Sequence, residues 1–213
     1  MVKAIVFDFD GTLASSFSLV EFCFKKIYKE ILGKEITVQE IEKYYGPSEK
    51  GIIQKMFGKD KSKEIFYQFL SDYNFYHDQF FKDFFPGMRE LLNELKKDGK
   101  EVFLLTGRSE ETAIISLTKL NAFSYFKDFY WGSTEGAIKD QLLKELMDDY
   151  EFKNDEIIYV GDSIQDVEQC NDANVKIASV TYNDPSYKDK LEKINPGMVF
   201  ESVEELKKYL LSL

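Results

Sequence analysis

Short apolar runs alternate with longer amphipathic stretches along most of the chain. Four runs are continuously apolar, which is typical of strands buried on both faces of a parallel sheet. One lies in the N-terminal segment VKAIVF, and the others are residues 101–105, 156–160 and 176–180. Helical periodicity predicts helices at 88–97, 111–120, 137–150 and 164–173. Strands that alternate with helices of this length predict βαβ units, and hence an α/β fold built on a parallel sheet.

Residues 14–84 follow a different pattern, with helical periodicity and no convincing strand. Thr37 and Glu40 have the spacing of a capping box at a helix start, and a longer helix is expected over 61–81. One stripe of apolar residues at helical spacing consists of Phe17, Val20, Phe24, Ile27 and Ile31. The segment is therefore predicted to be all-helical.

Charge also sets this segment apart. It holds 11 lysines and 11 acidic residues, so the rest of the chain carries the whole formal net charge of -10. We predict an all-helical cap at 14–84, inserted into a Rossmann-like core that is made of 1–13 and 85–213.

Composition excludes several classes of protein. A net charge of -10 opposes binding to nucleic acid or to an anionic membrane surface, since both need clustered cations. No apolar run approaches the roughly 20 residues that span a bilayer, and Asp8 and Asp10 interrupt the N-terminal run. Cys23 and Cys170 form no disulfide framework or CxxC site. A cytoplasmic setting is expected, and with His77 as the lone histidine, any chemistry falls to carboxylates, hydroxyls and lysine.

Two carboxylates directly follow the first strand. In extended backbone Asp8 and Asp10 share one face, and Gly11 lets the chain turn away sharply. Two close carboxylates repel one another, which favours a shared proton or a divalent cation between them. Alone, this pair is equally well explained as a solvated loop.

Other predicted strand ends carry matching chemistry. Asp162 and Asp166 follow the third run and offer the hard oxygen ligands that Mg²⁺ prefers. Thr106 and the N–H of Gly107 follow the second run and suit a phosphoryl oxygen. Lys139, in the first turn of a predicted helix, would neutralise phosphate charge. Each residue alone has a structural explanation, as a cap, turn or solvated lysine, but ligands bind beyond the carboxyl ends of parallel strands, so their coincidence favours an active site.

These motifs, DFDGTL followed by Thr106, Lys139 and GDSIQD, resemble the four motifs of the haloacid dehalogenase superfamily, in order and over essentially the whole chain. A helical insert directly after the first motif is similar to the helical-cap branch, which includes phosphoglycolate phosphatase-like and β-phosphoglucomutase-like enzymes. The resemblance implies a Rossmann-like sheet with the cap closing over the site.

The resemblance also implies roles. Asp8 would be the nucleophile that forms an aspartyl-phosphate, and Asp10 the general acid and base. Mg²⁺ would be held by the Asp8 carboxylate, the Asp10 backbone carbonyl and Asp162, with Asp166 as a direct or indirect ligand. Thr106 and the Gly107 N–H would bind the phosphoryl oxygens, and Lys139 would compensate charge.

The expected reaction is hydrolysis of a small phosphorylated metabolite. Dehalogenases and phosphonatases of the superfamily lack the acid at Asp10, so its presence favours phosphate esters. A phosphomutase of the β-phosphoglucomutase type remains an alternative, as does a non-enzymatic phosphoryl-binding protein. A receiver-type signalling domain would lack the DxDGT motif and the insert. The identity of the ester and the oligomeric state stay open, and nothing demands a partner subunit.

The chain departs from the family pattern at two points. Ser15 stands where many members have an acid, which affects contacts at the entry to the cap. Arg108 follows Thr106-Gly107, and we expect it to pair with Glu110 or Glu111 rather than to reach a second anionic group of the substrate. His77 and the aromatic tract 73–85 are expected to be packing residues.

Overall fold

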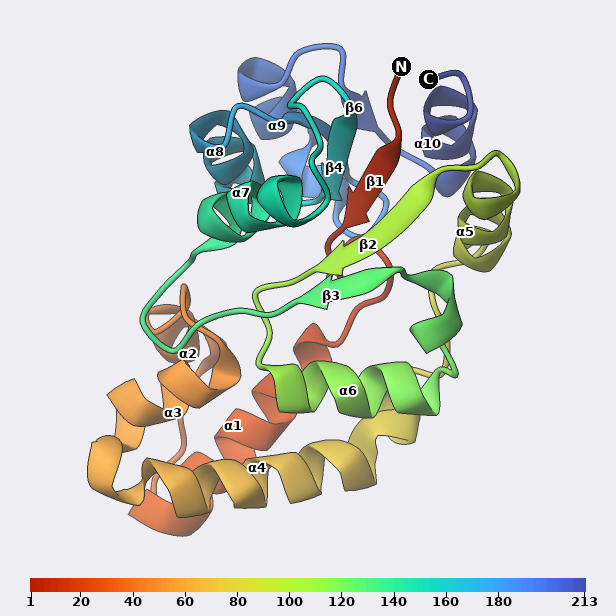
Figure 1. Cartoon of the computed structure of the whole chain (residues 1–213). Coiled ribbons are helices and arrows are strands. Elements are labelled where there is room, and N and C mark those ends of the chain that lie inside the picture. Colours follow the sequence, from red (N-terminus) through yellow and green to blue (C-terminus); the bar gives the residue numbers. More distant parts are fainter.

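The computed structural model describes all residues from Met1 to Leu213, and its centre is a six-stranded parallel sheet (Figure 1). The strand order is β3-β2-β1-β4-β5-β6. The strands are β1 (Ala4–Phe7), β2 (Glu101–Leu105), β3 (Asp128–Tyr130), β4 (Ile157–Gly161), β5 (Lys176–Val180) and β6 (Val199–Phe200). The predicted α/β fold with a parallel sheet is confirmed.

Helices cover both faces of the sheet because successive strand residues point to opposite sides. Ile5 and Phe7 belong to a core cluster with α5 (Met88–Lys97), α6 (Glu110–Lys119) and α10 (Val203–Leu210). Ala4 and Val6 belong to a second cluster on the other face. The helices of that face are α7 (Lys139–Asp149), α8 (Ile164–Asp172) and α9 (Lys188–Ile194).

Four helices lie between β1 and α5 in the sequence and form the lower lobe of Figure 1. They are α1 (Phe17–Leu32), α2 (Val38–Glu42), α3 (Glu49–Phe57) and α4 (Lys59–Phe80). Their buried residues form a third hydrophobic cluster, separate from the two on the sheet. The capping box of Thr37 and Glu40 is present at the start of α2. We call this lobe the cap; its division from the core at residues 14 and 84 remains a prediction.

The apolar stripe predicted for α1 is wrong at both ends. Phe17 and Ile31 are 39% and 37% exposed, whereas Leu19 and Cys23 are buried. Phe17 opens the helix and faces a cavity rather than the cap's interior. Leu19, Cys23 and Ile27 also have helical spacing, and packing against α4 buries them in place of the two ends of the predicted stripe.

The four predicted strands are present, and the structure adds two short ones, β3 and β6. These strands have three and two residues, too few to show a period in the sequence. Two 3-10 turns, η1 (Phe123–Tyr125) and η2 (Pro185–Tyr187), complete the elements.

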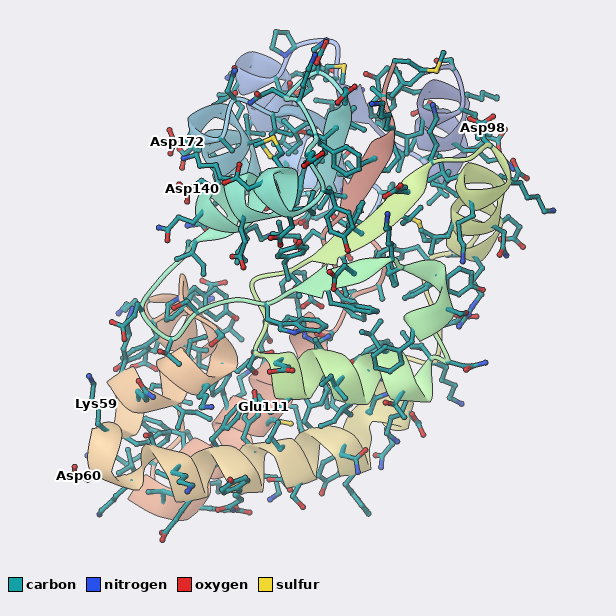
Figure 2. The ribbon with its side chains drawn as sticks, viewed as in Figure 1. Lys59, Asp60, Asp98, Glu111, Asp140 and Asp172 are labelled. Carbon is teal, nitrogen blue, oxygen red and sulfur yellow. The ribbon has the colours of Figure 1, made fainter.

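Charged residues at helix ends, such as Asp98 and Asp172, project outward (Figure 2). No helix combines the length and the hydropathy that crossing a bilayer requires.

Candidate active site

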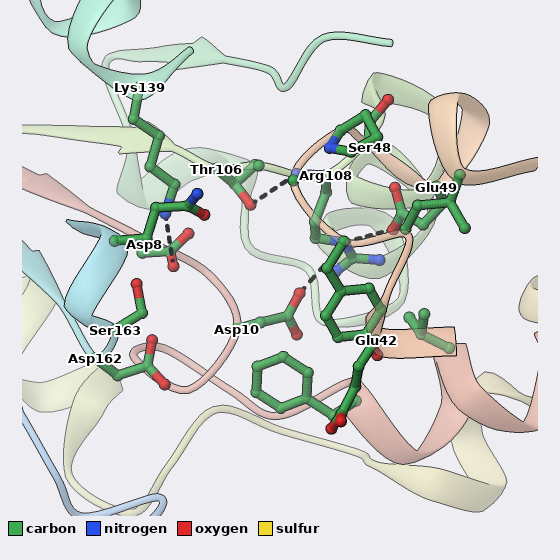
Figure 3. A pocket seen from close by; sticks show the side chains of 18 of the residues that line it. Asp8, Asp10, Glu42, Ser48, Glu49, Thr106, Arg108, Lys139, Asp162 and Ser163 are labelled. Carbon is green, nitrogen blue, oxygen red and sulfur yellow. Dashed lines mark hydrogen bonds and ion pairs between the residues drawn. The ribbon is translucent and has the colours of Figure 1, made fainter. Parts of the chain in front are cut away.

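The carboxyl ends of three adjacent strands meet at one cavity of about 710 Å³. Asp8 follows β1, Thr106 follows β2 and Asp162 follows β4, so parallel pairing of these strands places all three at the same edge of the sheet. Lys139, at the start of α7, and Asp10 line the same cavity (Figure 3). The structure thus brings the sequence-predicted residues together; their catalytic roles remain proposals.

Three carboxylates of this site lie close to one another and share one cation. One oxygen each from Asp8, Asp162 and Asp166 lie within 4.8 Å of one another. Lys139 Nζ is 2.9 Å from Asp8 Oδ2 and 2.6 Å from Asp166 Oδ1. Negative charge therefore exceeds positive charge in a buried place, which is the donor chemistry that suits Mg²⁺.

Burial makes this excess charge costly. It raises the pKa of Asp8 to about 7, opposed by Lys139. Burial, with Asp166 and Asp8 adding to it, also raises the pKa of Asp162 well above its usual range. For Lys139 burial acts in the opposite direction, but Asp166 and Asp8 raise its pKa above the ordinary value and keep it charged.

Asp162 and Asp166 differ in how they are held. Asp166 accepts hydrogen bonds from Ser163 N at 3.1 Å, Ser163 Oγ at 2.7 Å and Lys139 Nζ at 2.6 Å. The carboxylate of Asp162 accepts no hydrogen bond from the chain and lines the cavity. Asp162 therefore has both oxygens free for a metal ion, whereas Asp166 fixes Lys139 and Ser163. The side chain of Asp10 lies outside the three-carboxylate cluster.

Gly11 allows the first motif to approach the fourth. Its φ is 74°, in the left-handed region, and a Cβ at this position would lie 1.8 Å from Asp162 Oδ2. Any other residue would be strained and would also displace the Asp162 carboxylate.

Thr106 and Gly107 present unused donors at the cavity. Thr106 Oγ1 accepts a hydrogen bond from Arg108 N at 3.3 Å, which leaves the hydroxyl proton free to donate. The N–H of Gly107 has no acceptor within the chain. A phosphoryl oxygen would satisfy both.

Ser16 holds Asp10 at the entry to the cap. Asp10 Oδ1 accepts hydrogen bonds from Ser16 N at 2.9 Å and Ser16 Oγ at 2.6 Å, and Ser16 is buried. Ser16 therefore fixes the orientation of the Asp10 carboxylate. Its neighbour Ser15 is the residue that stands in place of the usual acid.

The expected pairing of Arg108 with Glu110 or Glu111 is wrong. Arg108 is buried and donates hydrogen bonds to Ser116 Oγ at 3.2 Å, to the Thr112 carbonyl at 3.0 Å and to the Tyr73 hydroxyl. Its side chain turns toward the junction of α6 and the cap, because Ser116 and Thr112 lie on α6 and Tyr73 lies on α4. The guanidinium carbon is also 4.7 Å from the centre of the Phe9 ring.

Arg108 also lies between two carboxylates. Its Nε is 3.8 Å from Asp10 Oδ2 and 3.6 Å from Glu49 Oε1, without a hydrogen bond to either. Burial works against the Arg108 charge, but Tyr73, Asp10 and Glu49 raise its pKa above the ordinary value.

Glu49 is a residue of the site that sequence reasoning missed. It is the first residue of α3 in the cap, yet its carboxylate accepts hydrogen bonds from Ser109 N at 2.7 Å, Ser109 Oγ at 2.9 Å and Thr112 Oγ1 at 2.9 Å. These donors lie at the N-terminus of α6, so a residue of the inserted lobe supplies the acceptor that caps the start of a core helix. The sequence contains no motif that signals a contact across 60 residues.

His77 has the packing role expected of it. It is fully buried, and its ring contacts Asp78 Oδ1 at 2.9 Å and Ser116 Oγ at 3.3 Å. No residue of the tract 73–85 lines the cavity, although Phe75 is 70% exposed rather than part of the core.

The parallel sheet and the inserted helices define an α/β protein with a Rossmann-like core, and its strand-end carboxylates form the candidate active site. A family model described as haloacid dehalogenase-like hydrolase matches residues 5–180. The chain therefore belongs to this family, as its motifs had indicated.

Curated relatives agree with this assignment. The chain is 28% identical over 213 residues to "Putative pyrophosphatase PpaX" of Caldanaerobacter subterraneus subsp. tengcongensis, covering 98% of this chain and 94% of the relative. It is 27% identical over 183 residues to the phosphoglycolate phosphatase of Aquifex aeolicus, covering 83% and 84%. The enzyme class expected from the sequence, a hydrolase of the phosphatase type, is confirmed.

Solved structures share the whole fold. The structure of a predicted phosphatase from Clostridium acetobutylicum superposes with a TM-score of 0.78 at 22% identity, with all of both chains covered. CbbY from Rhodobacter sphaeroides, in complex with phosphate, gives a TM-score of 0.77 at 17% identity, again over both whole chains.

Proposed function

We propose that this protein is a Mg²⁺-dependent phosphatase that hydrolyses a small phosphorylated metabolite through an aspartyl-phosphate on Asp8. One observation carries the proposal: Asp8, Thr106, Lys139 and Asp162, from four separate parts of the chain, line one cavity with Asp8 and Asp162 in a three-carboxylate cluster.

Asp8 is the nucleophile. Lys139 holds one of its carboxylate oxygens at 2.9 Å, and the carboxylate attacks phosphorus in line with the leaving oxygen. The bond from carboxylate oxygen to phosphorus forms as the ester bond to the leaving alcohol breaks. Because Asp8 is buried at the floor of the cavity, only a phosphoryl group presented end-on reaches it.

Asp10 moves the protons. It donates a proton to the leaving alcohol oxygen, and then takes one from the water that attacks phosphorus and releases Asp8. Ser16 holds one oxygen of Asp10 through two hydrogen bonds, which leaves the other for this proton.

Asp8, Asp162 and the backbone carbonyl of Asp10 would hold Mg²⁺, with Asp166 positioning Lys139. Bound there, the ion would offset the repulsion between an anionic nucleophile and an anionic phosphate. Thr106 and Gly107 donate hydrogen bonds to the phosphoryl oxygens. Lys139 offsets the negative charge of the phosphoryl group and of Asp8.

The size of the cavity and the names of the relatives suggest a substrate no larger than a small metabolite. Pyrophosphate and phosphoglycolate are the first compounds to test, because they appear in those names. A cytoplasmic setting remains a prediction.

Hydrolysis of p-nitrophenyl phosphate tests the proposal. Purified protein should release phosphate with Mg²⁺, stop in EDTA and recover when Mg²⁺ is restored. Asp8→Asn should remove turnover, whereas Asp98→Asn, at an exposed helix end, should retain it. Turnover that survives EDTA or Asp8→Asn would contradict the proposal.

A further inference from the structure

The cavity has a second wall, opposite the strand ends, that would face the alcohol part of a bound ester. The cap contributes Glu21 from α1, Glu42 from α2 and Glu49 from α3, while Asp184 after β5 lines the opposite rim. No lysine of the cap lines the cavity, although the cap holds 11.

The cations nearest to this wall are already engaged. Lys139 pairs with Asp8 and Asp166 at the floor. Lys50, which follows Glu49, turns away from the cavity to Glu111, at 3.3 Å. Glu42 forms no ion pair, and Glu21 has only Lys25, at 4.0 Å.

Arg108 is the one cation that belongs to the wall, and its charge is balanced. Asp10 and Glu49 lie on either side of its Nε. Arg108 lines the cavity, and its buried Nε has no hydrogen-bond acceptor within the chain. Because two carboxylates already offset the guanidinium, Arg108 leaves no net positive charge on the wall.

Tyr45 also lines the cavity, and its pKa reflects the same accumulation of negative charge. This side chain is 41% exposed, and its partial burial, with the carboxylates of Glu21, Glu42, Asp10 and Glu49, raises the pKa of its phenol to about 12. Side chains from three cap helices and the first motif therefore act on one point of the wall.

We infer that this wall selects phosphate esters whose alcohol part carries an ammonium group over esters whose alcohol part carries a second anion. The inference rests on the proposed phosphatase function and specifies its substrate class. An ammonium group would donate to Glu42 or Glu21 while the ester lies on Asp8; a carboxylate or second phosphate there would face uncompensated like charges. Pyrophosphate and phosphoglycolate, which appear in the names of the two relatives, both carry such a second anion.

Three esters of equal length test the inference: 2-aminoethyl phosphate, 2-hydroxyethyl phosphate and phosphoglycolate. They differ at the far end only, which is cationic, neutral or anionic. We expect kcat/KM to fall in that order, with at least about tenfold between the first and the last, and the ratio to shrink as added salt screens the wall.

Glu42→Gln assigns the effect to the wall. It should reduce the ratio between the cationic and anionic esters about threefold or more. Glu64→Gln, which removes the same charge from an exposed position on α4 outside the cavity, should leave the ratio unchanged.

Failure of this inference is distinguishable from failure of the phosphatase proposal. Turnover in which phosphoglycolate equals or exceeds the amino ester, or a ratio that Glu42→Gln leaves unchanged, overturns the selectivity and leaves the phosphatase function intact. No Mg²⁺-dependent turnover of any of the three esters or of p-nitrophenyl phosphate overturns both.

Discussion

The floor of the cavity and its cap-side wall are built from the same type of side chain, the carboxylate, but they hold it differently. On the floor, Asp8 and Asp166 are buried and tied to Lys139. On the wall, Glu42 is exposed and Glu21 half-buried, and neither forms a hydrogen bond or an ion pair with a core residue. The floor therefore fixes geometry, as bond-making requires, whereas the wall supplies a field that selects among leaving groups.

The largest expected effect concerns the floor. Asp8→Asn should lower kcat by roughly 10³-fold or more, because it removes the nucleophile. In EDTA it should nevertheless raise the midpoint of thermal unfolding at pH 8. The folded-state pKa of Asp8, about 7, lies above the usual value of 3.8, so its ionisation costs stability as pH rises from about 4 to 7.

Thermal unfolding of wild type and Asp8→Asn at pH 8 and pH 5, both in EDTA, measures this. The gap between the two midpoints should be wide at pH 8 and narrow at pH 5, where the wild-type carboxyl is protonated. A variant less stable than wild type at pH 8 would show that the floor is not strained by its charge.

The next effect concerns Asp162, the first carboxylate of the fourth motif. Asp162→Asn should weaken apparent Mg²⁺ affinity by at least about tenfold, because the Asp162 carboxylate is the one without a hydrogen bond. Activity titrated with Mg²⁺ measures it, with Asp172→Asn, an exposed acid on α8, as control. Equal Mg²⁺ dependence in the two variants would remove Asp162 from the metal site.

Glu49 joins the two regions, and its loss should affect both. Glu49→Ala leaves Ser109 N and Thr112 Oγ1 without their acceptor and should lower the free energy of unfolding by about 1–3 kcal/mol. It should also lower kcat/KM, because Arg108 then has Asp10 as its one nearby carboxylate.

Lys50→Ala is the matched control for Glu49→Ala. It breaks a different cap-to-core ion pair between the same two helices, one that is exposed. We expect the loss of this ion pair to lower the free energy of unfolding by less than about 0.5 kcal/mol. Equal decreases in the free energy of unfolding and in kcat/KM for the two variants would contradict the role assigned to Glu49.

The smallest effect lies at the far side of the cap–core junction, away from the cavity. Burial lowers the pKa of His77 below its usual 6.5, so the unfolded chain takes up a proton more readily and stability falls as pH drops below about 6.5. Denaturant unfolding at pH 7.5 and 5.5 should show this extra loss in wild type and not in His77→Gln. A pH dependence identical in both would contradict a neutral, buried His77.

The floor could be predicted from the sequence and most of the wall could not. Asp8, Thr106 and Asp162 each follow an apolar run, so local pattern and the rule for parallel sheets place them together. The position of Glu49 depends on how the cap sits on α6, and Arg108 turns toward the hydroxyl of Tyr73, 35 residues earlier in the chain. Similarly, packing against α4 buries Leu19 rather than Phe17, and β3 and β6 are too short to carry a period.

The most direct measurement looks for the covalent intermediate itself. Protein turning over p-nitrophenyl phosphate with Mg²⁺ is quenched in acid, digested and examined by mass spectrometry. The account predicts one added phosphoryl group on the peptide of the first motif, located on Asp8 and absent in EDTA. Normal phosphate release with the phosphoryl group on another residue, or with Asp8→Asn fully active, would contradict it.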